Sequence, residues 1–280
     1  MRYLIAVILV LSYGCSQGHR TIKSLNPRQV AKFVLKAKHK KWIKSFYHSD
    51  YYESDVYHLA FPVVTSIDKD TAEELGKSSG FLLLNGLTAI DRDVAEELSE
   101  VTDVLSLNGL KSIDKDVAKE LAKGKKSLFL DGLTLINREV ARGLVHSGQF
   151  SLSLNGLTSI DKDVAQELAK IKKGWLMLNG LTTIDKDVAQ ELAKFEVGGS
   201  VDLKGLNSVG KYIALGLEGI QVGGYLELNG LTSIDKDVAN ELAKFKGYRM
   251  SLYGLTSIDK DILEILQSNP NISLPENNHD

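Results

Sequence analysis

One pattern recurs along most of the chain and constrains its fold more than any other feature. The pattern is L-x-L-N-G-L-T-S-I-D-K-D-V-A-x-E-L-A-K. Its Asn position is occupied in turn by Asn85, Asn108, Asp131, Asn155, Asn179, Lys204, Asn229 and Tyr253. Neighbouring copies lie 23 to 25 residues apart, a weaker copy begins at His58, and residues 272–274 have the form of one last strand. A repeat of this length predicts a solenoid in which each copy is one structural unit.

Each copy predicts a short strand followed by a helix. Leu152 and Leu154 alternate with polar residues, which is the period of a strand with one buried face. Asp161 is a good helix N-cap, and the apolar residues of the segment 164–169 fall on one helical face. The Asn-Gly pair would often mark a hairpin turn, but a helical pattern follows it instead of a second strand. We therefore expect a strand, a turn and a helix.

The units can be stable only when they are stacked. A unit buries five or six apolar side chains at about 1.5–3 kcal/mol each, whereas ordering its backbone costs about 1–2 kcal/mol per residue. Strands joined through a helix must run parallel, and such crossovers are right-handed. The predicted fold is an α/β right-handed solenoid with parallel strands on the concave face and short helices on the convex face.

The L-x-L-N-G-L-x-x-I segment followed by an Ala-rich helix resembles the leucine-rich repeats of bacterial exported proteins, over about Leu59 to Leu274. The resemblance implies a horseshoe-shaped solenoid. The commonest family motif has an inward Asn three residues after the second Leu of L-x-L, where it forms a buried ladder. Here that place holds Leu157 and its equivalents, and the Asn directly follows the Leu. Alternation predicts that the Asn side chains point outward and that an inner apolar column replaces the buried ladder.

The first residues predict export. Met1-Arg2, the apolar run Tyr3–Leu11 and the small residues after it have the form of a secretory signal, assigned to residues 1–14. Cys15, the one cysteine of the chain, resembles the lipidated cysteine of bacterial lipoproteins, although Ser12 stands where those proteins usually carry Leu. The resemblance implies a lipid anchor to a membrane of the cell envelope, on the periplasmic or the cell-surface side. A plain signal peptide with an incidental cysteine is the alternative.

A basic segment precedes the repeats. After a linker, residues 15–25, the segment 26–57 opens with Asn26-Pro27, which is typical of a helix start. It continues the run of nine Lys and Arg residues between Arg20 and Lys44, with no acidic residue before Asp50. We expect a capping helix with a solvated basic face; the alternative is a segment that assists a lipid anchor at a membrane surface. Repeats then fill residues 58–275, and a disordered tail is expected at 276–280.

The sequence carries no motif typical of catalysis, metal binding or nucleic-acid binding. The net charge of −2 does not favour a nucleic-acid partner, and the histidines have no metal-ligand spacing. The repeated Asp-Lys-Asp invites a calcium interpretation, but helix capping already accounts for both carboxylates. Acid pairs that recur in every unit do not form a singular catalytic site. We expect a monomeric, non-enzymatic protein without a cofactor.

The copies differ most on the predicted concave face, which makes that face the candidate site for a partner. Its candidate residues are Phe81, Leu83, Asn85, Asn108, Phe129, Asn155, Trp175, Met177, Asn179, Tyr225 and Asn229. Exposed apolar side chains indicate protein recognition with Trp175 and Phe129 as anchors, unless loops cover them. The Asn stripe suits a glycan, or else it is strand-end turn chemistry repeated by duplication. A structural role in the envelope is the remaining alternative.

The seventh unit departs from the pattern. It reads Val209-Gly210-Lys211-Tyr212, and several further glycines follow. The unit loses both the capping Asp and much of its helix propensity. We expect a local irregularity or hinge around Ser208 to Gly224.

Overall fold

The computed structural model describes residues 58–275, apart from 79, 125–126, 146–150, 173, 196–198, 218, 220–223 and 257. The predicted signal peptide with Cys15, the linker, the basic segment 26–57 and the tail 276–280 lie outside the described residues.

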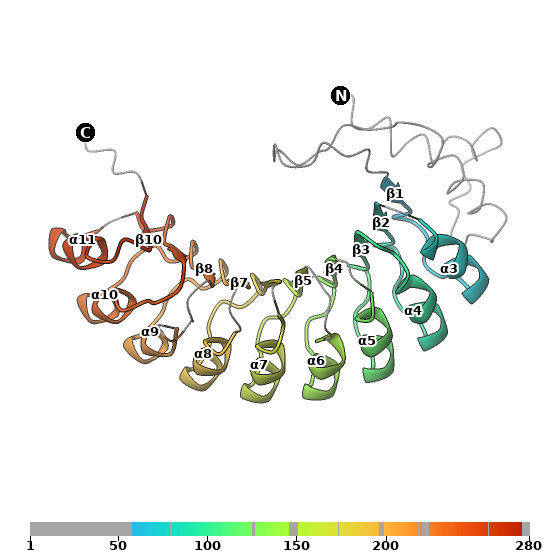
Figure 1. The fold of residues 1–280 in the computed structure, drawn as a ribbon, viewed down its shortest axis with the longest axis horizontal. Helices are drawn as coiled ribbons and strands as arrows, with labels where there is room; N and C mark the ends of the chain where they lie inside the picture. The colour runs from blue at the N-terminus through green and yellow to red at the C-terminus, as the bar shows by residue number, and fades with distance from the viewer. Residues whose placement is uncertain are drawn as a thin grey trace, which may run out of the picture.

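Ten short strands form one sheet in which every neighbouring pair is parallel and the strand order follows the chain (Figure 1). The strands are β1 (His58–Ala60), β2 (Phe81–Leu83), β3 (Val104–Ser106), β4 (Ser127–Phe129), β5 (Ser151–Ser153), β6 (Trp175–Met177), β7 (Ser200–Asp202), β8 (Tyr225–Glu227), β9 (Arg249–Ser251) and β10 (Ile272–Ser273). In the three-residue strands β1 to β9, the buried central residue pairs with its equivalent, as Leu128 does with Leu152 and Leu152 with Leu176. The variable loops before the strands therefore absorb the length differences without shifting the register.

A helix follows each of the first nine strands. The helices are α3 (Lys69–Gly76), α4 (Arg92–Leu98), α5 (Lys115–Leu121), α6 (Arg138–Leu144), α7 (Lys162–Leu168), α8 (Lys186–Leu192), α9 (Lys211–Leu217), α10 (Lys236–Leu242) and α11 (Lys260–Gln267). Figure 1 shows an arch with the strands along its inner edge and the helices along its outer edge. The predicted α/β leucine-rich-repeat solenoid, with parallel strands on the concave face and helices on the convex face, is confirmed.

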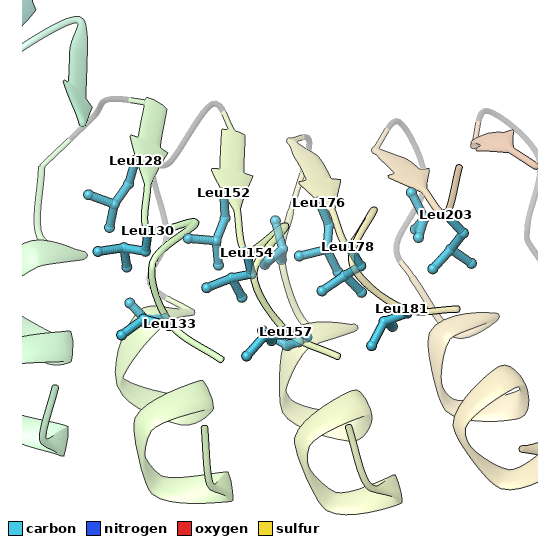
Figure 2. Packing of buried hydrophobic residues seen from close by; sticks show 14 of the residues in the cluster. Leu128, Leu130, Leu133, Leu152, Leu154, Leu157, Leu176, Leu178, Leu181 and Leu203 are labelled. Atoms are coloured by element: carbon cyan, nitrogen blue, oxygen red, sulfur yellow. The ribbon is translucent and has the colours of Figure 1, made fainter. Parts of the chain in front are cut away.

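Three columns of leucines fill the space between sheet and helices (Figure 2). In the fifth unit they are Leu152, Leu154 and Leu157, all fully buried. Equivalent side chains of the units on either side lie beside them, so the core is continuous along the arch. Leu157 and its equivalents confirm the predicted inner apolar column. Because each leucine is covered by neighbouring units, a unit on its own would leave its core exposed to water.

The glycine after each Asn sets how closely two units approach. A Cβ on Gly156 would lie 2.1 Å from the carbonyl oxygen of Asp131 in the preceding unit, and one on Gly180 would lie 2.2 Å from that of Asn155. No side chain fits at such distances. The Asn-Gly pair therefore serves close packing between units and not a hairpin turn.

Most helices begin with the side-chain cap that the sequence predicts, and α9 and α11 lack such a bond. The side chain of Asp161 accepts a hydrogen bond from the Val164 backbone N–H at 2.8 Å, and Asn137 does the same for Val140 at 2.9 Å. In the seventh unit the carbonyl of Gly210 accepts from the backbone N–H groups of both Ile213 and Ala214, at 3.0 Å each. Helix α9 forms all the same, and β7 and β8 keep their register. The predicted loss of the side-chain cap of α9 is confirmed, and the hinge around Ser208 to Gly224 stays a prediction.

Candidate functional site

Three columns of side chains cross the concave face. The first column holds the first residue of each strand, the second column holds the third residue, and the asparagine column lies two residues beyond the second. The middle strand residue faces the core, so its neighbours face outward. In the first column Trp175 and Tyr225 are 45% and 37% exposed. The other apolar candidates are half-buried: Phe81, Leu83, Phe129 and Met177.

The asparagine column forms a ladder between units. The side-chain oxygen of Asn155 accepts the backbone N–H of Asn179 at 2.9 Å, and that of Asn179 accepts the N–H of Lys204 at 2.9 Å. The same bond runs from Asn108 to Asn85, from Asp131 to Asn108, from Asn155 to Asp131 and from Tyr253 to Asn229. The polar ladder is thus kept rather than replaced, at a position two residues nearer the strand than in the common motif.

This ladder gives the Asn side chains a structural role. The amide nitrogens are also engaged in part, because Asn155 donates to the Ser153 hydroxyl at 2.9 Å and Asn179 donates to Asp202 at 3.1 Å. Strand-end chemistry repeated by duplication, the alternative left open by the sequence, accounts for these contacts. Direct binding of a partner by Asn85, Asn108, Asn155, Asn179 or Asn229 stays a prediction.

An aromatic row lies over strands β6 to β9, and we define it as Trp175, Tyr225 and Tyr248. The rings of Trp175 and Tyr225 are stacked, with centroids 6.5 Å apart and planes 20° apart. The rings of Tyr225 and Tyr248 are 4.9 Å apart and tilted by 51°. Tyr248 is 61% exposed. The structure therefore brings two predicted candidates together with a third ring.

A charged network borders the aromatic row, and we define it as Asp202, Lys204 and Glu227. The Lys204 ammonium lies 2.9 Å from an Asp202 oxygen and 3.1 Å from a Glu227 oxygen. Asn229 donates to Glu227 at 3.1 Å. Burial lowers the pKa of Lys204, but its hydrogen bonds to the two carboxylates outweigh this effect and leave the pKa raised. Lys204 is therefore protonated, and every member of the network is held in place.

Sequence reasoning missed Tyr248 as a member of the site. It directly precedes β9, in the loop of variable length, so counting strand positions does not place it on the concave face. Arg249, the first residue of β9, lies in the first column and was not predicted either. Its guanidinium donates to the Tyr253 hydroxyl at 2.5 Å. The sequence signal that could have indicated this part of the site is the aromatic Tyr248 directly before the strand residues Arg249 and Met250.

The convex face carries buried carboxylates whose contacts are structural. Glu167 is almost fully buried and receives hydrogen bonds from Arg138 at 3.0 Å, Arg142 at 3.2 Å and Lys170 at 2.5 Å. Burial alone raises the pKa of Glu167, but these three donors outweigh it and lower the pKa to about 2. Two of the three cations come from the preceding unit, so the ion cluster joins neighbouring helices.

Within the described part of the chain, no group of three or more His, Cys, Asp and Glu side chains is arranged to hold a metal ion. Among the same residues, no helix combines the length and apolar character needed to cross a membrane.

The parallel strand order, the leucine columns and the outer helices define a leucine-rich-repeat solenoid. No protein-family model and no curated protein matches the chain. Among solved structures, the chain is similar to an internalin from Listeria monocytogenes. The identity is 14%, the match covers 76% of this chain and 84% of the internalin chain, and the TM-score is 0.29. The fold class accordingly rests on this chain's own strand register and core.

Proposed function

We propose that this chain is a non-enzymatic binding protein of the bacterial cell envelope that recognises another protein through its concave face. The observation that carries the proposal is a constant backbone with changing outward side chains. Strands β4, β5 and β6 keep one register, while their second-column residues are Phe129, Ser153 and Met177. A surface of this kind can be specific for one partner, because the side chain at this fixed position changes from each unit to the next.

The chemistry of the concave face suits a protein partner. Phe129 and Met177 are half-buried, and Trp175 is nearly half exposed. Large apolar and aromatic side chains are enriched in the central, energetically dominant part of protein interfaces. The short strands hold these side chains on a rigid platform, so little conformational entropy is lost when a partner binds.

Export and lipid anchoring belong to the proposal and rest on the apolar run Tyr3–Leu11 and on Cys15. Mass spectrometry of the mature protein tests them directly. We expect a diacylglycerol on Cys15 as the first residue, and Cys15→Ser should release the protein from the membrane fraction. A mature N-terminus elsewhere, without lipid, would remove the anchor from the proposal.

Site-specific photocrosslinking in the full chain tests the binding face. A photoreactive phenylalanine at position 129 or 177 should crosslink one and the same protein, whereas the same group at Gln190 or Asn240 on the convex helices should not. Phe129→Ala should then weaken binding of that protein at least about tenfold. Leu135→Ala is the matched control, because Leu135 is 71% exposed but lies in the loop before α6. Equal crosslinking from both faces would contradict the proposal. A structural role predicts that concave-face changes are silent.

A further inference from the structure

Two rings of the aromatic row lie closer together than the strands that carry them. Trp175 and Tyr225 belong to β6 and β8, whose backbones are two strand spacings apart, roughly 9.5 Å. Their ring centroids are only 6.5 Å apart. The two rings lean together over Ser200 of β7, which is small and 4% exposed. Tyr248 extends the row, so three exposed rings form one strip across four strands.

A parallel strip of hydrogen-bonding groups runs beside the rings. Asp202 and Glu227 lie two residues beyond Ser200 and Tyr225, which places them on the same face and roughly 6.6 Å further along the strands. The Lys204 and Glu227 side chains are 44% and 25% exposed, so they can reach a ligand. Because the network holds them in place, they present an ammonium donor and a carboxylate acceptor in fixed positions.

The charges of this strip favour a neutral ligand. An anion that approached Lys204 would meet the carboxylates of Asp202 and Glu227, about 3 Å from the ammonium on either side. A cation would be attracted only weakly, because Lys204 is shared by both carboxylates and neutralises most of their charge. A ligand without charge that both donates and accepts hydrogen bonds meets no repulsion.

We propose that the aromatic row and the charged network form a binding subsite for a neutral oligosaccharide chain, in addition to the protein-binding role. A sugar ring has a face of C–H groups, which stacks on an aromatic ring, and hydroxyl groups at its edge, which donate and accept. The sugar rings lie along the exposed surface of the aromatic row, and their hydroxyls bond to Glu227, Lys204 and Asn229. Trp175 belongs to both surfaces, whereas the subsite does not use Phe129, so a change at Phe129 tests the proposed protein contact separately.

Tryptophan fluorescence of the full chain tests the subsite. The chain has two tryptophans, and Trp42→Phe leaves Trp175 as the reporter. This protein is titrated separately with cellohexaose, chitohexaose and laminarihexaose. We expect a saturable change in emission with at least one of them. No change with any of the three would overturn the proposal.

Variants then distinguish a saccharide subsite from a site for a charged peptide. By calorimetry with the responding hexasaccharide, Tyr225→Ala should weaken binding at least about tenfold. Phe129→Ala should leave it unchanged, and an unchanged melting temperature shows that each variant is folded. Binding should be nearly constant between about 0.05 M and about 0.5 M NaCl, and Glu227→Gln should retain most of it because the amide still forms hydrogen bonds.

The proposal would be overturned if the protein bound hexalysine but none of the sugars, and if high salt or Glu227→Gln abolished that binding. Such a result would identify a basic peptide as the ligand. The two proposals fail separately. If no sugar changes the fluorescence but position 129 still crosslinks a protein, only the saccharide subsite is refuted. If a sugar binds but position 129 crosslinks no protein, only the protein contact is refuted.

Discussion

Restoring the missing helix cap of the seventh unit should stabilise the protein. Helix α9 is preceded by Gly210, where α8 and α10 are preceded by Asp185 and Asp235. A Cβ on Gly210 would meet no atom within 4 Å, and the glycine does not have a positive φ. Gly210→Asp can therefore adopt the capping geometry without strain.

The size of the effect follows from the bonds at the helix start. In α8 the Asp185 carboxylate accepts the Val188 N–H at 2.8 Å. The corresponding N–H in α9, that of Ile213, already donates to the Gly210 carbonyl at 3.0 Å. Only part of a typical capping gain of about 0.5–2 kcal/mol remains, so we expect about 0.5–1 kcal/mol. For a protein of this size that corresponds to about 1–4 °C in melting temperature.

Hydrogen exchange and thermal melting measure this prediction together. In the parent protein the amides of Ser208 to Gly224 should exchange faster than those of the neighbouring units, which tests the predicted hinge. Gly210→Asp should slow exchange at Ile213 and Ala214 and raise the melting temperature. Gly210→Ala is the control for a general glycine effect, and it should give no gain because Ala is a poor N-cap. Equal behaviour of the Asp and Ala variants would refute the capping argument.

Three further predictions test the contacts between units. Asn155→Ala should cost about 1–2 kcal/mol in unfolding free energy because the Asn179 N–H loses its acceptor; the exposed Asn240→Ala should cost less than about 0.5 kcal/mol in urea titrations. Leu154→Ala should cost about 2–5 kcal/mol, since the side chain is fully buried, and a cost no larger than that of the exposed Ser159→Ala would contradict the core assignment. Glu167 has a folded-state pKa of about 2 against an ordinary 4.5, so its contribution is complete above pH 4.5 and is lost as the pH falls toward 2. Melts of the parent and Glu167→Gln should therefore differ most above pH 4.5 and converge below it, and a constant difference down to pH 2 would count against the ion cluster.

Most of the fold could be predicted from the sequence because every copy of the repeat predicts the same strand, turn and helix. Leu152 and Leu154 predict the buried strand face, Asp161 predicts the helix start, and both are seen. The ladder of the asparagine column could not be predicted, because alternation places Asn155 outward but does not say that its oxygen reaches the backbone of the next unit. Bonds between units depend on the close approach that Gly156 permits, which is a property of the stack.

The site could be predicted only in part, for a related reason. Column positions identified Trp175 and Tyr225, since both lie at the start of a strand. Their contact across β7 depends on the small Ser200 between them, and Tyr248 joins the row from a loop. Whether two side chains on strands two apart touch depends on their rotamers, and a repeat pattern does not predict rotamers. Likewise, the repeat pattern places Lys204 in the asparagine column but does not indicate that it joins Asp202 and Glu227.

The seventh unit shows how a departure from the repeat is accommodated without breaking the stack. In the other helices the second residue is acidic, and the first lysine of the preceding helix can pair with it, as Lys162 does with Asp187 at 3.4 Å and Lys236 with Asp261 at 3.0 Å. In α9 this residue is Tyr212, and Lys186 lies over its ring, 5.7 Å from the centroid. A cation–π contact thus takes the place of an exposed ion pair, and both are worth about 1 kcal/mol or less at an exposed site. The substitution is therefore nearly neutral for stacking, while the core leucines and the glycine after the Asn position, which contact neighbouring units, vary far less between the copies. Positions that contact only water or a weak surface partner are free to diverge, and on the concave face these are the positions from which a specific binding surface can be built.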